Sequence, residues 1–159
     1  NALGDLVILL AYAFLPTLGT SFVVAGGIVP SVLIIALPLG LVTDGILHSN
    51  NTRDMATDSR AGIRTMAMSL GVKSSATLYG FEVLFPFVWV GLCSICGFMP
   101  LATVIVFMTL PVAIACAQTM MKSVDGGTHL IADLDVRTAN LQLIFSLLLT
   151  VAFVVARFL

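Results

Sequence analysis

Long apolar runs separated by two polar stretches dominate the chain. Each of five runs contains about 20 residues, enough to cross the hydrocarbon core of a bilayer as a helix. These runs cover approximately residues 5–26, 28–48, 74–97, 100–121 and 138–158. Residues 49–73 and 122–137 form the two long polar connections. The pattern predicts one all-α domain over residues 1–159, a polytopic bundle of transmembrane helices with both long loops at the same end.

Composition supports a membrane protein and excludes several other classes. Of the 159 residues, 59% are hydrophobic and 9% are charged, whereas a soluble domain carries about 25% charged residues. The formal net charge of -1 gives no positive surface for a polyanion, so we expect no nucleic-acid partner. Cys93, Cys96 and Cys116 all lie in apolar runs, where a thiol packs as a small hydrophobic group. We therefore expect neither a disulfide framework nor a cysteine metal site.

The distribution of charge predicts an orientation in the membrane. Six positive residues lie at the end that carries the long loops, and they are Arg53, Arg60, Arg64, Lys73, Lys122 and Arg137. Only Arg157 lies at the opposite end. The positive-inside rule then places residue 1 and both loops in the cytoplasm and the C-terminus outside, in a membrane that we expect to be of the bacterial inner-membrane type. Asp133 and Asp135 of the second loop are expected to be solvated.

The polar stretch over residues 48–62 follows the second predicted helix and holds the candidate site. If that helix continues into water, a rotation of about 100° per residue places Asn50, Asp54 and Asp58 within an arc of about 80°. Asn51 lies just beyond this arc. One helix face would therefore present two carboxylates and two amides.

Two further pairs of residues border this face. Asp44 and His48 extend its edge toward the membrane, and Arg53 and Arg60 lie together on the opposite flank of Asn50. An acidic stripe and a basic stripe would thus run side by side along the helix.

Paired carboxylates one turn apart repel each other unless a positive group lies between them, either Arg side chains or a divalent cation. Oxygen ligands without cysteine favour Mg²⁺ over zinc as the cation. Mg²⁺ takes one or two protein carboxylates and completes its shell with water and phosphate oxygens, while Arg holds the remaining phosphate charge. We therefore expect Asp54 and Asp58 to bind Mg²⁺ with a lipid diphosphate, such as a prenyl diphosphate, whose tail enters the membrane. The alternative on these residues alone is a solvated charged face.

The same stretch resembles the UbiA superfamily of intramembrane prenyltransferases. The match is to the second of the two Asp-rich motifs of that family, and it continues into the flanking helices. The matching residues are Asn50-Asn51-Thr52-Arg53-Asp54, Asp58, Arg60-Ala61-Gly62, Arg64-Thr65, Ser69-Leu70-Gly71, Gly4-Asp5, Leu18-Gly19-Thr20 and Arg137-Thr138-Ala139-Asn140-Leu141. The pattern looks most like the branch that prenylates 1,4-dihydroxy-2-naphthoate in menaquinone synthesis. Residues 48–55 are also similar to animal relatives that form menaquinone-4.

The resemblance implies roles for the residues of the acidic face. Asp54 and Asp58 would hold Mg²⁺ on the prenyl diphosphate, with Asn50 and Asn51 as supporting catalytic residues. The resemblance also implies a nine-helix bundle, of which this chain supplies the last five helices. The first Asp-rich motif would lie upstream of Asn1, so this chain alone is expected to be inactive.

A further set of residues is expected to contact the substrate. The resemblance implies that Arg53 and Arg60 face the phosphates. Ile63 stands where bacterial members of the branch often have Lys, which leaves open whether Arg64 covers that part of the diphosphate. The full set expected to bind substrate is Arg53, Arg60, Arg64, Arg137, His48 and Asp44.

The resemblance implies a function in which a prenyl group passes from its diphosphate to an aromatic acceptor. The expected acceptor is 1,4-dihydroxy-2-naphthoate, which also loses its carboxyl group. Other family acceptors, namely 4-hydroxybenzoate, a chlorophyllide or a glycerol phosphate backbone, are alternatives. An alternative of a different class is a non-catalytic transporter module, in which Asp44, the intramembrane Glu82 and the Asp pair form an ion pathway.

Overall fold

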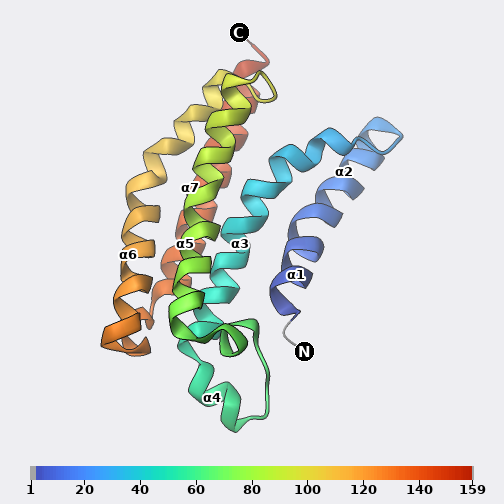
Figure 1. Cartoon of the computed structure of the whole chain (residues 1–159). Helices are drawn as coiled ribbons and strands as arrows, with labels where there is room; N and C mark the ends of the chain where they lie inside the picture. The colour runs from blue at the N-terminus through green and yellow to red at the C-terminus, as the bar shows by residue number, and fades with distance from the viewer. Residues whose placement is uncertain (1–2, 159) are drawn as a thin grey trace.

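The computed structural model describes residues 3–158, and every element in this part of the chain is helical. In chain order the elements are α1 (Gly4–Ile8), η1 (Leu9–Phe14), α2 (Leu15–Ala25), η2 (Pro30–Val32), α3 (Leu33–Arg53), α4 (Met55–Arg60), α5 (Met66–Ile95), η3 (Leu101–Thr109), α6 (Leu110–Gly126), η4 (Thr128–Ile131) and α7 (Leu134–Ala156). They combine into five segments long and apolar enough to cross a membrane, which are Gly4–Ala25, Pro30–Arg53, Met66–Ile95, Leu101–Gly126 and Thr128–Ala156. The predicted all-α polytopic class is confirmed, and Figure 1 shows the segments running up and down the bundle.

Both long loops are shorter than the apolar pattern predicts. In the first loop, α3 continues to Arg53, α4 occupies Met55–Arg60, and α5 begins at Met66 rather than at 74. In the second loop, α6 continues to Gly126 and α7 begins at Leu134 rather than at 138. An apolar run ends where the side chains become polar, but a helix continues for as long as its backbone hydrogen bonds do. The loop residues at the ends of α3 and α6 and at the start of α7 therefore extend the membrane helices. Residues 66–70 instead form a separate helical turn, because the backbone of Gly71 is not helical.

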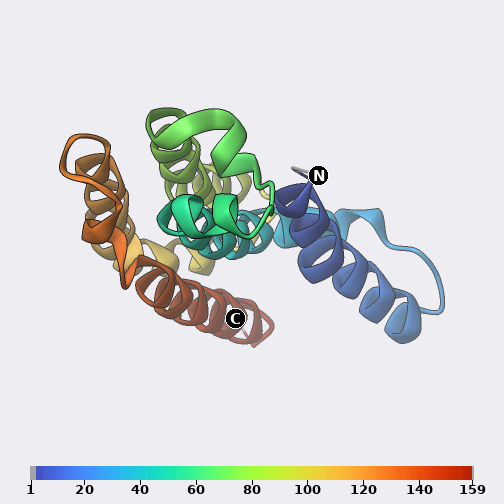
Figure 2. The ribbon, with the colours of Figure 1, turned by 90° about the horizontal axis from the view of Figure 1, so that it is seen from below.

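Helix α3 lies at the centre of the bundle. It packs against α5 and α7, and also against α1 and η1, as the end-on view in Figure 2 shows. The Tyr79 hydroxyl of α5 and the Thr138 hydroxyl of α7 are hydrogen-bonded at 2.7 Å. Phe87 packs edge to face against Phe145, with ring centroids 5.3 Å apart. These buried contacts hold α5 and α7 together, and so fix the surroundings of the polar end of α3.

The first segment, Gly4–Ala25, is the least covered of the five. Only 6% of its most apolar window is buried, and Tyr12 and Val23 are among its many exposed large apolar side chains. Its close approach to α3 occurs at Gly40, where an added Cβ would lie 2.6 Å from Leu9 Cδ1. A glycine at this position therefore lets η1 lie directly against α3.

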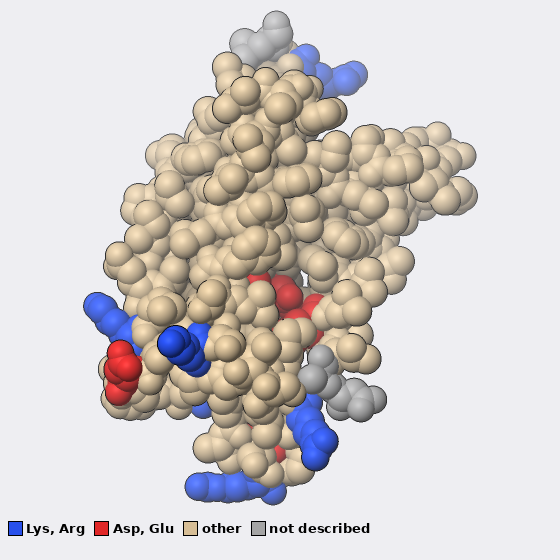
Figure 3. All heavy atoms as spheres, in the orientation of Figure 1, with Lys and Arg blue, Asp and Glu red and all other residues tan. Residues whose placement is uncertain are grey.

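Basic side chains gather at the two ends of the bundle. Figure 3 shows most Lys and Arg atoms at the lower end and others at the upper end, with a broad band without Lys or Arg between them. The lower end carries α4 and the connection from α6 to α7, whereas Arg157 follows α7 at the upper end. An apolar band with polar ends is the surface of a protein that crosses a bilayer several times.

Candidate functional site

The polar end of α3 keeps three of the predicted site residues at one-turn spacing. α3 ends at Arg53, and Asp54, with φ -93° and ψ 6°, connects it to α4. Helical hydrogen bonds continue across this break, because the Asp54 N–H donates to the Asn50 carbonyl at 3.0 Å and the Asp58 N–H donates to the Asp54 carbonyl at 2.9 Å. Asn50, Asp54 and Asp58 therefore remain one turn apart although the helix is interrupted.

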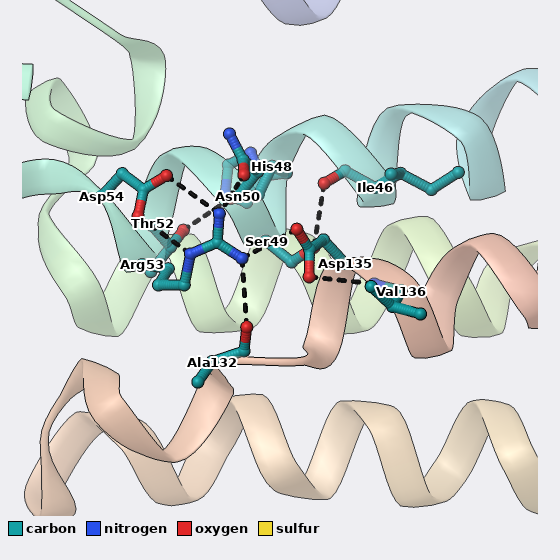
Figure 4. A network of polar contacts seen from close by, with 10 residues as sticks. All are labelled: Ile46, His48, Ser49, Asn50, Thr52, Arg53, Asp54, Ala132, Asp135 and Val136. Atoms are coloured by element: carbon teal, nitrogen blue, oxygen red, sulfur yellow. Dashed lines mark hydrogen bonds and ion pairs between the residues drawn. The ribbon is translucent and has the colours of Figure 1, made fainter.

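Arg53 lies at the centre of a polar network at this helix end (Figure 4). Its Nε donates to Asp54 Oδ1 at 2.8 Å and its Nη2 donates to Asp54 Oδ2 at 2.9 Å, which makes a bidentate pair. Nη2 also donates to Asn50 Oδ1. Nη1 donates to Asp135 Oδ2 at 2.7 Å and to the Ala132 carbonyl at 3.2 Å. One guanidinium thus ties the end of α3 to the start of α7.

This network corrects one expectation from the sequence and adds detail to another. Arg53 was expected on the flank of Asn50 opposite Asp44 and His48, and its long side chain folds from there onto Asn50 and Asp54. Asp135, expected to be solvated, is a partner of Arg53 because the packing of α7 on α3 brings the two together.

The same network sets the charge state of the Asp54 carboxyl group. Its hydrogen bond with Arg53 lowers the pKa of Asp54 below the usual range, and the positive charge of Arg53 acts in the same direction. The side chains of Arg53 and Asp54 are 25% and 35% exposed, so solvent weakens but does not remove this interaction. Asp54 is therefore ionised at neutral pH and held in one orientation.

Other predicted residues surround the helix end without joining the network. Asn51 is half-buried, and Arg60 and Arg64 are exposed. Arg64 lines a polar cavity of about 350 Å³ beyond α4. Arg137 is half-buried and donates to the hydroxyl of Thr119 on α6 at 3.3 Å, so it points toward another helix.

Asp44 and His48 lie away from Asn50, in a separate group of polar side chains. His48 precedes Asn50 by two residues, so the two side chains are about 200° apart around the helix. His48 Nδ1 lies 2.9 Å from Asp5 Oδ1 on α1 and 3.8 Å from Glu82 Oε1 on α5. All four side chains are buried, and we call Asp5, Asp44, His48 and Glu82 the buried cluster. The structure thus gives His48 partners other than the acidic face that it was predicted to extend, and it places Asp44 beside Asp5 and Glu82 in the lining of one cavity.

Asp5 is the member of the buried cluster to which the sequence assigned no role. It lies in the first apolar run, and a carboxylate inside a membrane segment is costly and usually functional. That rule is the signal that identifies Asp5 in the sequence. Its partner His48 is 43 residues away, so no local pattern relates the two.

The donor set at the end of α3 fits a hard divalent cation. Asp54 and Asp58 supply carboxylate oxygens one turn apart, and the same face carries no sulfur ligand. Mg²⁺ prefers oxygen ligands and typically uses one or two protein carboxylates. A carboxylate oxygen that accepts a hydrogen bond from Arg retains a second lone pair. Asp54 can therefore keep Arg53 as its partner and still bind a cation together with Asp58.

An apolar groove of about 300 Å³ begins at the same helix end. It is lined by Ile8, Tyr12, Thr43, Ile46, Leu47, Asn50 and Asp135. Asn50 and Asp135 also belong to the Arg53 network. The groove therefore joins the polar network to the apolar surface between α3 and the first segment. Such a site can hold a molecule with a charged head and an apolar chain.

The fold and this site define an integral, multi-pass membrane protein with an acidic, arginine-containing site at one end of its bundle. The sequence model of the UbiA prenyltransferase family matches residues 1–141. The chain therefore belongs to the UbiA prenyltransferase family.

Curated relatives of the chain are animal proteins named UbiA prenyltransferase domain-containing protein 1. The chain is 41% identical to that of Ailuropoda melanoleuca and 42% identical to that of Mus musculus, each over 107 residues, which are 65% of this chain and 32% of the relative. It is 42% identical to the Drosophila melanogaster homologue over 86 residues, which are 54% of this chain and 24% of the relative. The matches thus span about a third or less of each relative. These relatives are eukaryotic, so they give no support to the expected bacterial inner membrane.

Proposed function

We propose that the protein to which this chain belongs transfers a prenyl group from a prenyl diphosphate to an aromatic acceptor, in a reaction that depends on Mg²⁺. The observation that carries this proposal is the position of Asp54, Asp58 and Arg53. They lie at the polar end of a membrane helix, beside an apolar groove. Membership of a prenyltransferase family supports the same reaction.

Each part of the site has a chemical role in this proposal. Asp54 and Asp58 hold the cation, and Arg53 keeps Asp54 ionised and oriented. Bound there, Mg²⁺ would neutralise the diphosphate as the allylic C–O bond breaks. Asn50, at the mouth of the groove, positions the head group while the groove takes the prenyl chain. The apolar walls exclude water, so the electron-rich ring of the acceptor captures the allylic carbon instead of a water molecule.

The exposed arginines complete the recognition of the diphosphate in this proposal. Arg60 and Arg64 are free of the Arg53 network and lie just beyond Asp58. Arg side chains suit phosphate groups because their planar fork donates two parallel hydrogen bonds. We expect them to hold phosphate oxygens that the cation does not contact. Arg137 would join them only if it left Thr119.

We propose 1,4-dihydroxy-2-naphthoate as the acceptor, with loss of its carboxyl group, as in menaquinone synthesis. The support is the likeness of residues 50–65 and 69–71 to that branch of the family. The printed names of the animal relatives specify no acceptor. Acceptors such as 4-hydroxybenzoate are therefore outcomes of the test.

The experiment is an in vitro assay of the full-length protein in detergent, with 1,4-dihydroxy-2-naphthoate and a prenyl diphosphate, with and without Mg²⁺. Mass spectrometry should detect a prenylated, decarboxylated naphthoquinol product only when Mg²⁺ is present. Product from 4-hydroxybenzoate alone would keep the reaction and replace the acceptor. Cation flux in proteoliposomes without any dependence on prenyl diphosphate would overturn the proposal and favour a transporter.

Substitutions in the full-length protein test the assignment of the site. Asp54→Asn and Asp58→Asn remove the negative charges that hold the cation, so turnover should fall roughly a hundredfold or more, as expected when a group that stabilises transition-state charge is lost. Asp125→Asn is the matched control, because Asp125 is an exposed carboxylate at the same end of the bundle. Near-normal activity of the Asp54 and Asp58 variants would contradict the metal site.

A further inference from the structure

A second polar site lies inside the membrane-spanning part of the bundle, apart from the end of α3. It is the buried cluster, to which α1 contributes Asp5, α3 contributes Asp44 and His48, and α5 contributes Glu82. None of the four is more than 7% exposed. Asp5, Asp44 and Glu82 line a cavity of about 270 Å³ whose other walls are apolar. Figure 3 shows acidic atoms at the bottom of a hollow in the apolar face.

Three potential ligand atoms of the cluster converge on one point. Asp5 Oδ1, His48 Nδ1 and Glu82 Oε1 all lie within 4.8 Å of one another. The imidazole nitrogen is 2.9 Å from the Asp5 oxygen and 3.8 Å from the Glu82 oxygen. An ion about 2.1 Å from both the nitrogen and one of these oxygens would have a bond angle of about 90° with Asp5 and about 130° with Glu82. Such angles occur in four- and five-coordinate metal sites.

The charge of the cluster also calls for a cation. It contains three carboxyl groups and one imidazole, and no Lys or Arg forms an ion pair with them within residues 3–158. Asp5 Oδ2, Asp44 Oδ1 and Glu82 Oε2 are buried and have no hydrogen-bond partner in the same part of the chain. Buried carboxylates without partners are strongly unfavourable in a low-dielectric interior. A divalent cation would compensate most of this charge.

We propose that Asp5, His48 and Glu82 bind a divalent transition-metal ion of the Zn²⁺ class. One imidazole and two carboxylates are typical ligands of zinc and of its first-row neighbours, whereas Mg²⁺ prefers a shell of oxygens alone. The ion is therefore chemically distinct from the cation proposed for Asp54 and Asp58. Asp5 and Glu82 line the cavity together with Asp44, whose unpartnered Oδ1 can bind the ion or a water on it.

The bound ion has a structural consequence for the bundle. Its three ligands come from α1, α3 and α5, so it ties the first segment to the centre of the fold. That segment is otherwise thinly covered and contacts the rest of the bundle mainly through α3. Coordination of the metal would therefore fix the position of α1 against α3 and α5.

Metal analysis of the full-length protein tests this proposal directly. The protein is purified through a tag without histidine, dialysed against Zn²⁺ and then against metal-free buffer, and its metal is measured by mass spectrometry. We expect about one ion per chain in the wild type and at least tenfold less in His48→Gln and Glu82→Gln, because both substitutions remove a ligand. His129→Gln is the matched control, since His129 is exposed on η4, and Asp54→Asn is a second one. Both should retain the ion.

Thermal unfolding of the wild type provides a measurement that does not depend on how the variants fold. After treatment with a chelator, added Zn²⁺ should raise the unfolding midpoint, while an equal concentration of Mg²⁺ should not. The proposal is overturned if the wild type retains no transition metal and its midpoint is indifferent to Zn²⁺. It is also overturned if His48→Gln retains as much metal as the wild type.

Discussion

Arg53 is the residue on which the polar end of α3 depends. Its guanidinium contacts Asn50 and Asp54 on its own helix end and Asp135 on α7. Most of its hydrogen-bond donors are therefore used inside the protein. In our account Arg53 acts mainly by orienting Asp54, and the exposed Arg60 and Arg64 meet the phosphates.

The contact between Arg53 and Asp135 should stabilise the bundle measurably. Asp135→Asn removes the charge of a 2.7 Å hydrogen bond between α3 and α7. A partly exposed, charge-assisted bond of this kind contributes about 1 kcal/mol, so the free energy of unfolding should fall by about that amount. Chemical unfolding in detergent measures it. Asp133→Asn, at an exposed neighbouring carboxylate, should leave the stability unchanged, and an equal loss in both variants would contradict the role of Asp135.

The ion pair of Arg53 and Asp54 should make stability depend on pH in acid. In the folded protein the pKa of Asp54 lies below its ordinary value of 3.8. The Asp54 carboxylate therefore binds a proton more readily in the unfolded chain than in the folded one. At pH values well above 3.8 the ion pair therefore makes its full contribution to the free energy of unfolding. This contribution falls as the pH drops below 3.8 and through the lowered pKa of the folded state. The difference in unfolding midpoint between wild type and Asp54→Asn should be constant from about pH 7 to 5 and shrink below 3.8. In an Arg53→Gln background, the difference in unfolding midpoint should no longer shrink below pH 3.8.

Local spacing made part of the site predictable. The one-turn spacing of Asn50, Asp54 and Asp58 follows from the i, i+4 geometry of a helix, and the backbone hydrogen bonds preserve it. The bonds from Arg53 to Asp135 and from His48 to Asp5 could not be predicted, because they join residues 82 and 43 positions apart. Such contacts depend on how α3, α7 and α1 pack.

Gly71 divides α5 into a short first turn and a long membrane helix. Its φ of 76° and ψ of 163° are not helical, and the helices on either side meet at this bend. Side chains with a Cβ rarely adopt this conformation. The bend lets the chain turn from the exposed connection after α4 into the bundle.

Gly71→Ala should therefore destabilise the protein through its backbone alone. Nothing lies within 4 Å of a Cβ at this position, so no collision contributes. Strain in this region of φ and ψ costs about 1–3 kcal/mol, which is the expected loss in the free energy of unfolding. Gly80→Ala is the matched control, since Gly80 is helical and its added Cβ also meets nothing within 4 Å. If both variants unfold at the same denaturant concentration, the bend at Gly71 carries no strain.

The apolar pattern predicted the five membrane segments well and the ends of their helices poorly. Hydropathy reports where side chains are apolar, and this identified the segments later seen as Gly4–Ala25 through Thr128–Ala156. It does not report backbone hydrogen bonding, which continues α3 to Arg53 and starts α7 at Leu134. The polar helix ends excluded by the apolar pattern are the parts that carry the candidate site.

The whole molecule has most of its basic residues and its candidate diphosphate site at one end. Figure 1 shows α4 and the start of the described chain at the lower end, and the end of α7 at the upper end. Positive charges at a helix end favour the cytoplasmic side. The lower end, with Asp54 and Asp58, should therefore face the cytoplasm.

Labelling of cysteines in intact cells checks this orientation. Cys96 is exposed in the connection at the upper end, so a membrane-impermeant maleimide should label it from outside. In a variant with Ala at all native cysteines, a thiol introduced by Asp125→Cys at the lower end should react only after the membrane is opened. The reverse pattern would show that the positive charges do not set the orientation.

Asp54 and Asp58 should hold a prenyl diphosphate through Mg²⁺. The most direct measurement is calorimetric binding of a non-reactive prenyl thiodiphosphate to the full-length protein, with Mg²⁺ or with a chelator. We predict that affinity falls roughly tenfold or more when Mg²⁺ is removed or when Asp58→Asn is introduced, as for loss of a metal or a metal ligand. The Asp125→Asn control should bind as the wild type does. Equal affinity of the wild type with and without Mg²⁺, or of Asp58→Asn and the wild type, would contradict the account.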